Sequence, residues 1–215
     1  MSSLRLLVVD DHPGFRLGLV TMIDASPDMR VVADLSTGEE TLPAYREHRP
    51  DIVLIDLRLP GLSGVATIMA LRREFPDCRV IVITTYDADE DIYRALQAGA
   101  KSFLLKDLTP EELRETIRAV HRGETPLPAA VAQRLASRLS RPELTPRERE
   151  MVQFIVRGFS NKEMAAQFGI TEDTVKGHLK NVFMKLGVSD RTQAAIHALQ
   201  HGIVHLWSER EPAPK

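Results

Sequence analysis

The sequence predicts an α/β domain built on a parallel sheet, joined by a linker to a small all-helical domain. Three observations support this fold class. Short apolar runs alternate with helical stretches over residues 1–122, a segment punctuated by proline and glycine follows at 123–142, and short helices dominate from 143 onward. Alternation at this spacing is typical of βαβ units, in which helices cover both faces of a parallel sheet.

Five apolar runs in the first part have the length of a strand. The run at 52–55 is Ile-Val-Leu-Ile, which favours a central strand buried on both faces. Helical stretches at 63–75 and 90–98 end at Pro76 and Gly99, and a further helix starts at a capping box formed by Thr109 and Glu112. The expected strands are residues 5–9, 30–33, 52–55, 80–83 and 102–105.

Polar side chains stand at the ends of four of these runs. Asp10 and Asp11 follow the first run, Asp56 follows the third, and Thr84 and Lys106 follow the fourth and fifth. Because the carboxyl ends of parallel strands share one edge of the sheet, we expect these five residues to converge there.

Three converging carboxylates repel one another, and a hard divalent cation such as Mg²⁺ relieves that repulsion. A carboxylate beside the cation can attack a phosphoryl group to form an aspartyl phosphate. Lys106 would neutralise charge on the transferred group and Thr84 would donate a hydrogen bond to it. The alternative is that the acids only cap strand ends and Lys106 is a solvated ion-pair partner, but matching positions at four strand ends favour the site.

Composition bounds the class of protein. The 215 residues include 43% hydrophobic residues, enough for ordinary globular cores. Residues 1–122 carry 15 Lys+Arg against 20 Asp+Glu, whereas residues 123–215 carry 13 against 10. The acidic part suits a metal site and the basic part tolerates a polyanion, although neither imbalance proves a partner.

The same composition predicts a cytoplasmic protein. Cys78 is the only cysteine, so an intrachain disulfide is impossible, and the apolar runs are too short to span a bilayer. Arg5, Asp10 and Asp11 interrupt the first apolar segment, which therefore does not resemble a signal peptide.

Residues 4–122 resemble the receiver domain of two-component response regulators. The motifs that carry this resemblance are Asp10-Asp11, Asp56 with the downstream Leu-Pro-Gly61, Thr84 and Lys106. The resemblance implies a flavodoxin-like sheet of five parallel strands in the order 2-1-3-4-5. It also implies phosphoryl transfer from a cognate sensor histidine kinase to Asp56, with Mg²⁺ held by Asp10, Asp11, Asp56 and the backbone carbonyl of Arg58.

The resemblance further implies a switch pair, Thr84 and Phe103, although Phe103 could equally be a plain core aromatic residue. Two alternative functions are disfavoured by the residues present. A vestigial receiver on a phosphorylation-independent DNA-binding protein does not agree with five intact motif residues. A phosphatase with an aspartate nucleophile would place a second aspartate two residues later as general acid, and here that position is Arg58. We therefore expect a non-enzyme.

The linker, residues 123–142, contains a short amphipathic stretch. Val131, Leu135 and Leu139 repeat every four residues and give a helix a narrow apolar stripe. Such a helix would lie on a neighbouring domain or, alternatively, form a dimer contact.

The second part begins with two capping boxes, Thr145-Pro-Arg-Glu148 and Ser160-Asn-Lys-Glu163, and Thr171 can cap a third helix. A turn containing Gly169 joins the second and third helices, which together form a helix-turn-helix unit. On the third helix one apolar seam faces the core, formed by Val175, Leu179, Val182 and Leu186.

The opposite face of that helix is expected to enter a major groove, with central side chains on base edges and marginal lysines on phosphates. The alternative is a merely solvated helix face. Gly177 is unusual at a mid-helix position and removes one possible base contact. The candidate DNA-binding residues are Lys162, Thr174, Lys176, Gly177, Lys180, Asn181 and Lys185.

Residues 144–204 are similar to the LuxR-type DNA-binding domain, and with the receiver they resemble the NarL/FixJ class of transcriptional regulators. Two motifs carry this similarity, Leu-Thr-Pro-Arg-Glu-Arg-Glu150 and Gly-Phe-Ser-Asn-Lys-Glu163, together with the stretch from Thr174 to Gly187. It implies a four-helix domain at 143–206, a disordered tail at 207–215, and dimerisation on phosphorylation. The implied partners are an inverted-repeat promoter DNA and RNA polymerase.

The last expected helix, near 191–201, carries Ala195, Ile196 and Leu199, which would form a dimer contact or close the four-helix core. His197, His201 and His205 are spaced by four residues, but Gly202 is expected to end the helix, so we favour histidines near a helix C-terminus over a metal site.

Overall fold

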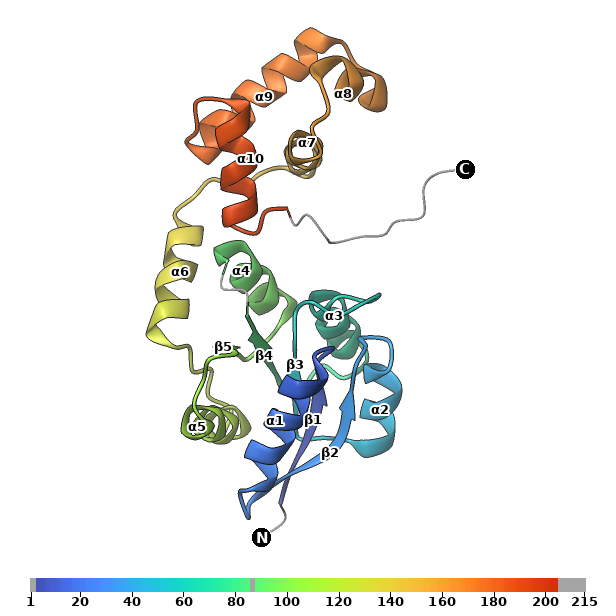
Figure 1. Cartoon of the computed structure of the whole chain (residues 1–215), viewed down its shortest axis with the longest axis vertical. Coiled ribbons are helices and arrows are strands. Elements are labelled where there is room, and N and C mark those ends of the chain that lie inside the picture. Colours follow the sequence, from blue (N-terminus) through green and yellow to red (C-terminus); the bar gives the residue numbers. More distant parts are fainter. Residues whose placement is uncertain (1–2, 86–87, 205–215) are drawn as a thin grey trace. The chain divides into compact units, whose positions relative to one another are not determined.

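The computed structural model describes residues 3–85 and 88–204, and these form two compact units. The first unit contains the parallel sheet and the second contains a helical domain; each is described by itself (Figure 1). None of the helices within these described ranges has the length and apolar character that crossing a membrane requires. The expected tail at 207–215 and His205 lie outside the described residues.

A parallel sheet with the strand order β2-β1-β3-β4-β5 forms the centre of the first unit. This confirms the predicted flavodoxin-like topology. The second strand is longer at both ends than its apolar run indicated, because the buried Met29 at its start and Asp34 and Leu35 at its end continue the pairing with β1. The strands are β1 Leu4–Val9, β2 Met29–Leu35, β3 Ile52–Ile55, β4 Val80–Thr84 and β5 Ser102–Leu105.

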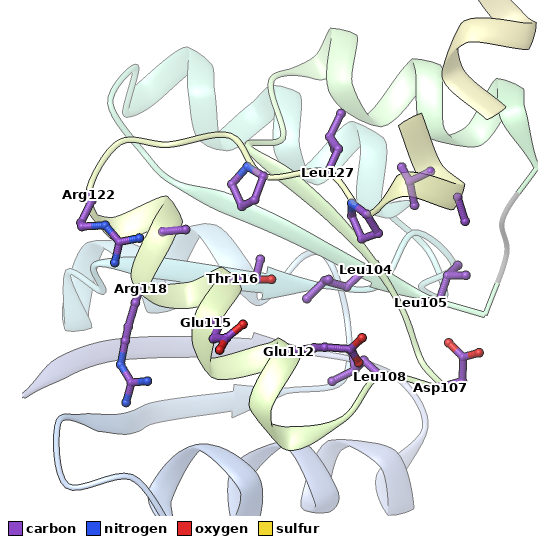
Figure 2. A pocket seen from close by; sticks show the side chains of 15 residues that line it. Leu104, Leu105, Asp107, Leu108, Glu112, Glu115, Thr116, Arg118, Arg122 and Leu127 are labelled. Atoms are coloured by element: carbon purple, nitrogen blue, oxygen red, sulfur yellow. The ribbon is translucent and has the colours of Figure 1, made fainter. Parts of the chain in front are cut away.

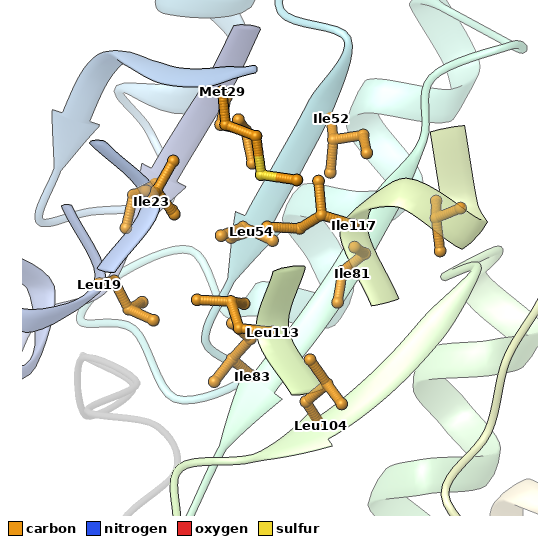
Figure 3. Close-up of a cluster of buried hydrophobic side chains, with 13 residues drawn as sticks. Leu19, Ile23, Met29, Ile52, Leu54, Ile81, Ile83, Leu104, Leu113 and Ile117 are labelled. Atoms are coloured by element: carbon orange, nitrogen blue, oxygen red, sulfur yellow. The ribbon is translucent and has the colours of Figure 1, made fainter. Parts of the chain in front are cut away.

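Helices cover both faces of this sheet (Figure 1). One face packs on α1 and α5, and the shared core contains side chains from all five strands, among them Met29, Leu54 and Ile81 (Figure 3). The capping box of Thr109 and Glu112 starts α5, as expected. The helices of this part are α1 Pro13–Asp24, α2 Thr41–His48, α3 Gly64–Glu74, α4 Asp89–Ala98 and α5 Pro110–His121.

The segment after α5 contains α6 Ala129–Leu139, the helix expected in the linker. Its predicted stripe is only partly buried: Val131 is 1% exposed, whereas Leu139 is 62% exposed. The four-residue repeat therefore marks the helix correctly but overstates how much of it is covered.

Four helices form the second unit, α7 Pro146–Val156, α8 Asn161–Phe168, α9 Glu172–Leu186 and α10 Arg191–Gln200. Both predicted capping boxes are present at α7 and α8, and Thr171 caps α9. The predicted seam of α9 is buried in the domain core. On α10 Ala194 and Ala198 are fully buried in that core and Ala195 is partly buried against it, whereas Ile196 is 50% exposed. The helix thus helps to close the four-helix core, and the dimer contact stays a prediction.

One ion pair ties the end of α9 to the start of α7. Lys185 Nζ lies 2.6 Å from Glu148 Oε2 and also donates to the carbonyl of Glu143 at 3.1 Å. Burial would raise the pKa of Glu148, but its hydrogen bonds with Lys185 and Thr145 outweigh burial and lower this pKa below the ordinary 4.5. The carboxylate therefore remains charged in the folded domain and serves both the capping box and the lysine.

Gly64 allows α3 to start directly against the strand end that carries Asp56. Its backbone N–H donates to Leu57 O at 2.9 Å. A Cβ at this position would lie 2.1 Å from Asp56 O and 2.7 Å from Leu57 Cα, distances that real atoms do not tolerate. The close approach fixes the path of the backbone just after Asp56.

We expect Gly64→Ala to destabilise the first unit by about 1–3 kcal/mol, because the added methyl group overpacks rigid backbone. The matched control is Gly18→Ala in α1, where a methyl group would have no other atom within 4 Å; helix propensity should make that variant more stable by about 0.5–1 kcal/mol. Calorimetric unfolding of both variants measures the difference. A Gly64→Ala variant as stable as Gly18→Ala would contradict this account of the α3 start.

We expect Lys185→Ala to destabilise the second unit by about 1–3 kcal/mol at pH 7, because a buried carboxylate loses a charged hydrogen bond. Lys176→Ala is the control, since Lys176 and its partner Asp173 are 61% and 88% exposed and solvent screens such a surface pair. Because the folded-state pKa of Glu148 is lowered, the pair stabilises above pH 4.5 and its contribution is lost as pH falls through the folded value. An effect of Lys185→Ala that does not shrink in acid would refute the ion-pair explanation.

Candidate functional site

Pairing of β1 with β3 places two of the predicted carboxylates side by side. Val9 is opposite Ile55 in the register, so Asp10 and Asp56 leave adjacent strands at the same level. The backbone N–H of Asp56 donates to Val9 O at 2.9 Å. Asp10 is 1% exposed and Asp56 is 3% exposed, so both acids are held in a nearly dry position.

Lys106 lies between these two acids. Its Nζ is 2.7 Å from Asp10 Oδ2 and 2.7 Å from Asp56 Oδ2, and it stands 4.7 Å from the ring centroid of Phe15 on α1. Burial would lower the pKa of the Lys106 ammonium, but its contacts with Asp10 and Asp56 outweigh burial and raise this pKa. The lysine is therefore charged and offsets the repulsion between the two carboxylates.

Three carboxylates and one imidazole gather at this strand edge in a way that fits a divalent cation. Ligand atoms of Asp10, Asp11, His12 and Asp56 lie within 4.8 Å of one another. Asp10 Oδ2 is buried and lies 2.7 Å from the Lys106 ammonium, whereas Asp11 is exposed. Several carboxylate oxygens gathered in this way are the donor set that a hard cation prefers. The sequence patterns did not indicate His12 as part of this set.

The backbones of Arg58 and Thr84 also contact residues of this site, and the roles expected of the Arg58 carbonyl and the Thr84 hydroxyl stay predictions. The backbone N–H of Arg58 donates to Asp56 Oδ1 at 3.2 Å, so this residue's backbone lies against the carboxylate. Thr84 ends β4, is fully buried, and its carbonyl accepts from the backbone N–H of Lys106 at 3.0 Å. Phe103 is also fully buried. Its role in a switch pair with Thr84 stays a prediction.

A hollow of about 690 Å³ lies away from these acids, between α5, the end of β5 and residues 126–131 (Figure 2). Leu104, Leu127 and Val131 give it apolar walls. It arises where the segment after α5 crosses β5, a crossing held by a hydrogen bond of 2.7 Å from Ser102 Oγ to Pro126 O. Since the paired carboxylates line no part of this hollow, we place the chemistry at the open strand edge instead.

The exposed face of α9 is the second candidate site. Gly169, with φ 64°, ends α8 in the left-handed conformation and lets the chain turn into α9, as the helix-turn-helix prediction requires. Most candidate DNA-binding residues are exposed on this unit, namely Lys162, Thr174, Lys176, Gly177, Lys180 and Asn181. Position 177 opens to free space, because a Cβ there would have no other atom within 4 Å.

Lys185 departs from the expected set. Its ammonium is directed toward Glu148 and the carbonyl of Glu143, within its own domain. The angular position on the helix wheel suggested a phosphate contact, but a buried acid on α7, distant in sequence, holds this side chain. We therefore assign Lys185 to the stability of the domain.

Two further features belong to this face of α9. Met184, at the centre of the face, is 73% exposed, one of the largest exposures of an apolar side chain among the residues described. A hollow of about 400 Å³ runs beside it, lined by Asn161 of α8 and by Lys180 and Phe183 of α9. The exposed methionine was visible in the helical pattern, whereas Asn161 comes from another helix and needed the tertiary structure.

The two described histidines of α10 and its cap stack on one another, with ring centroids 4.2 Å apart. Burial lowers the pKa of His197 to about 4, assisted by the neighbouring His201 and Arg141. His197 is thus neutral at pH 7.

Known proteins resemble the chain along nearly its whole length. The response regulator receiver domain family matches residues 6–118, and the luxR family of bacterial regulatory proteins matches residues 142–198. The uncharacterized transcriptional regulatory protein YhcZ of Bacillus subtilis (strain 168) is 40% identical over 209 residues, covering 93% of this chain and 97% of YhcZ. The transcriptional regulatory protein LiaR of the same strain is 38% identical over 210 residues, covering 94% and 100%.

A solved structure agrees with these relatives. The crystal structure of the response regulator ChrA of a heme-sensing two-component system is 36% identical, covers 95% of this chain and 100% of ChrA, and has a TM-score of 0.58. The paired strand-end acids with their lysine, the helix-turn-helix unit and these similarities lead to one family. The chain belongs to the two-component response regulators of the NarL/FixJ class, which join a receiver domain to a LuxR-type DNA-binding domain.

Proposed function

We propose that Asp56 accepts a phosphoryl group from a histidine kinase and that this transfer controls promoter binding by the second domain. The observation that carries the proposal is the position of Lys106, whose ammonium lies 2.7 Å from both Asp10 and Asp56. A buried ammonium between two buried carboxylates can exchange its contact with one of them for a contact with a phosphoryl oxygen.

In the proposed transfer a carboxylate oxygen of Asp56 forms a bond to phosphorus while the bond from phosphorus to the kinase imidazole nitrogen breaks. The electron pair of that bond stays on the imidazole. Lys106 moves from Asp56 to an oxygen of the transferred group and offsets its charge. Thr84, one strand away, supplies a hydroxyl that can donate to another of its oxygens.

Asp10, Asp11, Asp56 and the backbone carbonyl of Arg58 would hold Mg²⁺ at this edge. When bound, the cation supplies charge neutralisation for the acids and for the phosphoryl oxygens. The clustering of the acids, whose ligand atoms lie within 4.8 Å of one another, supports this set.

For the second domain we propose that α9 enters the major groove of promoter DNA. Lys180 and Asn181 lie centrally on its exposed face and would contact base edges, while Lys176, Lys162 and Thr174 would contact phosphates. The ion pair of Lys176 with Asp173 is 2.8 Å long and exposed to solvent, so a phosphate can replace the aspartate at little cost in free energy.

We further propose that phosphorylation acts by promoting a dimer. One recognition helix reads only a few base pairs, whereas two domains about a two-fold axis read an inverted repeat about one helical turn apart. Ile196, half exposed on α10 beside the buried Ala194, offers an apolar contact for such a partner. Both roles fit α10 because its core contact uses the opposite residues, Ala194 and Ala198.

The first prediction from this proposal concerns the phosphoacceptor. Wild-type protein treated with a small phosphodonor and Mg²⁺ should be labelled on Asp56 alone, and a chelator should abolish labelling. Asp56→Asn should remain unlabelled, whereas the control Asp107→Asn, an exposed acid beside Lys106, should label like the wild type. Mass spectrometry locates the label. Equal labelling of Asp56→Asn, or labelling undiminished by chelator, would reject the assignment.

The second prediction separates base contacts from phosphate contacts. Lys176→Ala should weaken binding to all DNA alike and lower the salt slope by about one unit. Lys180→Ala should reduce the difference in affinity between promoter DNA and random DNA. Lys185→Ala should leave the salt slope unchanged, when measured at a temperature at which this variant is folded. Fluorescence titration at several salt concentrations measures all three. If Lys180→Ala discriminates between promoter DNA and random DNA as well as the wild type does, the assignment of Lys180 to a base contact is wrong.

The third prediction concerns regulation. Phosphorylation should tighten both self-association and promoter binding, the latter roughly 5- to 150-fold if the coupling has an ordinary size. In the Ile196→Glu variant, phosphorylation should no longer tighten self-association or promoter binding, although the variant should still accept the phosphoryl group. Sedimentation and DNA titration, with and without phosphodonor, decide the matter. The dimer proposal fails should the dimer constant and the promoter affinity stay unchanged on phosphorylation.

A further inference from the structure

His12 sits next to the paired acids and plays no part in the function proposed above. It is the N-cap residue of α1, but its side chain makes no capping hydrogen bond. Its ring instead turns toward the acids, with Nδ1 2.8 Å from Asp11 Oδ1 and 3.4 Å from Asp10 Oδ1. The backbone N–H of His12 also donates to Asp10 Oδ1 at 2.8 Å.

These contacts place an imidazole nitrogen among the oxygens of the cation site. The ligand atoms of His12 and of the three acids all lie within 4.8 Å of one another, and within the described part of the chain no other group of three or more such residues does so. The His12 side chain is 66% exposed, so its ring can adjust by small rotations without disturbing the core. Its backbone, in contrast, is fixed by the hydrogen bond to Asp10.

The donor type matters because divalent ions differ in their preference for nitrogen. Mg²⁺ binds oxygen ligands and keeps several waters. Imidazole suits the later first-row ions, and affinity for a site with nitrogen rises from Mn²⁺ through Co²⁺ and Ni²⁺. A site of three carboxylates alone offers these ions no nitrogen ligand.

We propose that His12 is a fourth ligand of this site, which makes it bind Co²⁺ and Ni²⁺ through one imidazole nitrogen in addition to the oxygens that serve Mg²⁺. The proposal rests on the proposed cation site and specifies its selectivity. With Mg²⁺ bound, His12 remains a neighbour of Asp11; with Co²⁺ or Ni²⁺ bound, its Nδ1 leaves Asp11 for the metal.

The test uses the full-length chain without a histidine tag. Affinities for Mg²⁺ and Co²⁺ are measured by calorimetry for the wild type, for His12→Asn and for the control His121→Asn, which removes an exposed histidine of α5. Excess Mg²⁺ identifies the fraction of Co²⁺ held at the shared site and sets aside weak binding by other histidines. Proton spectra of the Co²⁺ form provide a second readout, since a coordinated imidazole shows a strongly shifted exchangeable N–H signal.

The proposal predicts that His12→Asn lowers the affinity of the shared site for Co²⁺ by roughly tenfold or more and removes the shifted signal. Mg²⁺ affinity should stay within about twofold, and His121→Asn should behave as the wild type. Equal changes for both ions, or a shifted signal that survives in His12→Asn, would overturn the role of His12 while leaving the cation site intact. A wild-type protein that binds Co²⁺ without competition from Mg²⁺ would instead overturn the shared cation site itself.

Discussion

Parallel pairing of β1 with β3 is the constraint on which the chemistry of the first domain depends. The register sets Asp10 and Asp56 at one level, and burial of both makes their mutual repulsion costly in free energy. Lys106, delivered by the end of β5, offsets that repulsion. The pairing of β4 with β5 positions the lysine in turn, through the hydrogen bond from its backbone to Thr84. The receiver site is therefore a property of the sheet, and no single loop could assemble it.

The helical domain is under a different constraint, because packing in its core must orient α9 so that one face of this helix stays exposed to a polyanion. Glu148 contributes to this orientation, because it completes the capping box at the start of α7 and forms an ion pair with Lys185 near the end of α9. The pair fixes the orientation of α9 and removes one positive charge from its outer surface. Because Lys185 is bound within the domain, fewer lysines are free on the outer face of α9 than the sequence suggests. The same face carries the exposed Met184.

Two glycines show how differently the same residue type serves the two domains. At Gly64 a side chain would collide with the backbone of Asp56, so glycine is required for the close start of α3. At Gly177 the space beyond the helix is empty, so glycine is not required by the fold and even weakens the helix. On the face of α9 that we propose to contact DNA, glycine leaves room for close approach of a partner.

The sequence by itself determined the location of the five strands, the capping boxes of α5, α7 and α8 and the buried seam of α9, because these signals are local or periodic along the chain. The tertiary structure alone decided which groups meet: Lys185 with Glu148, the ring of His12 with Asp11, and Ala194 and Ala198 with the domain core. Such contacts join residues by strand register, helix rotation and side-chain rotamer. Packing between elements distant in the sequence sets these variables, so local sequence patterns cannot predict them.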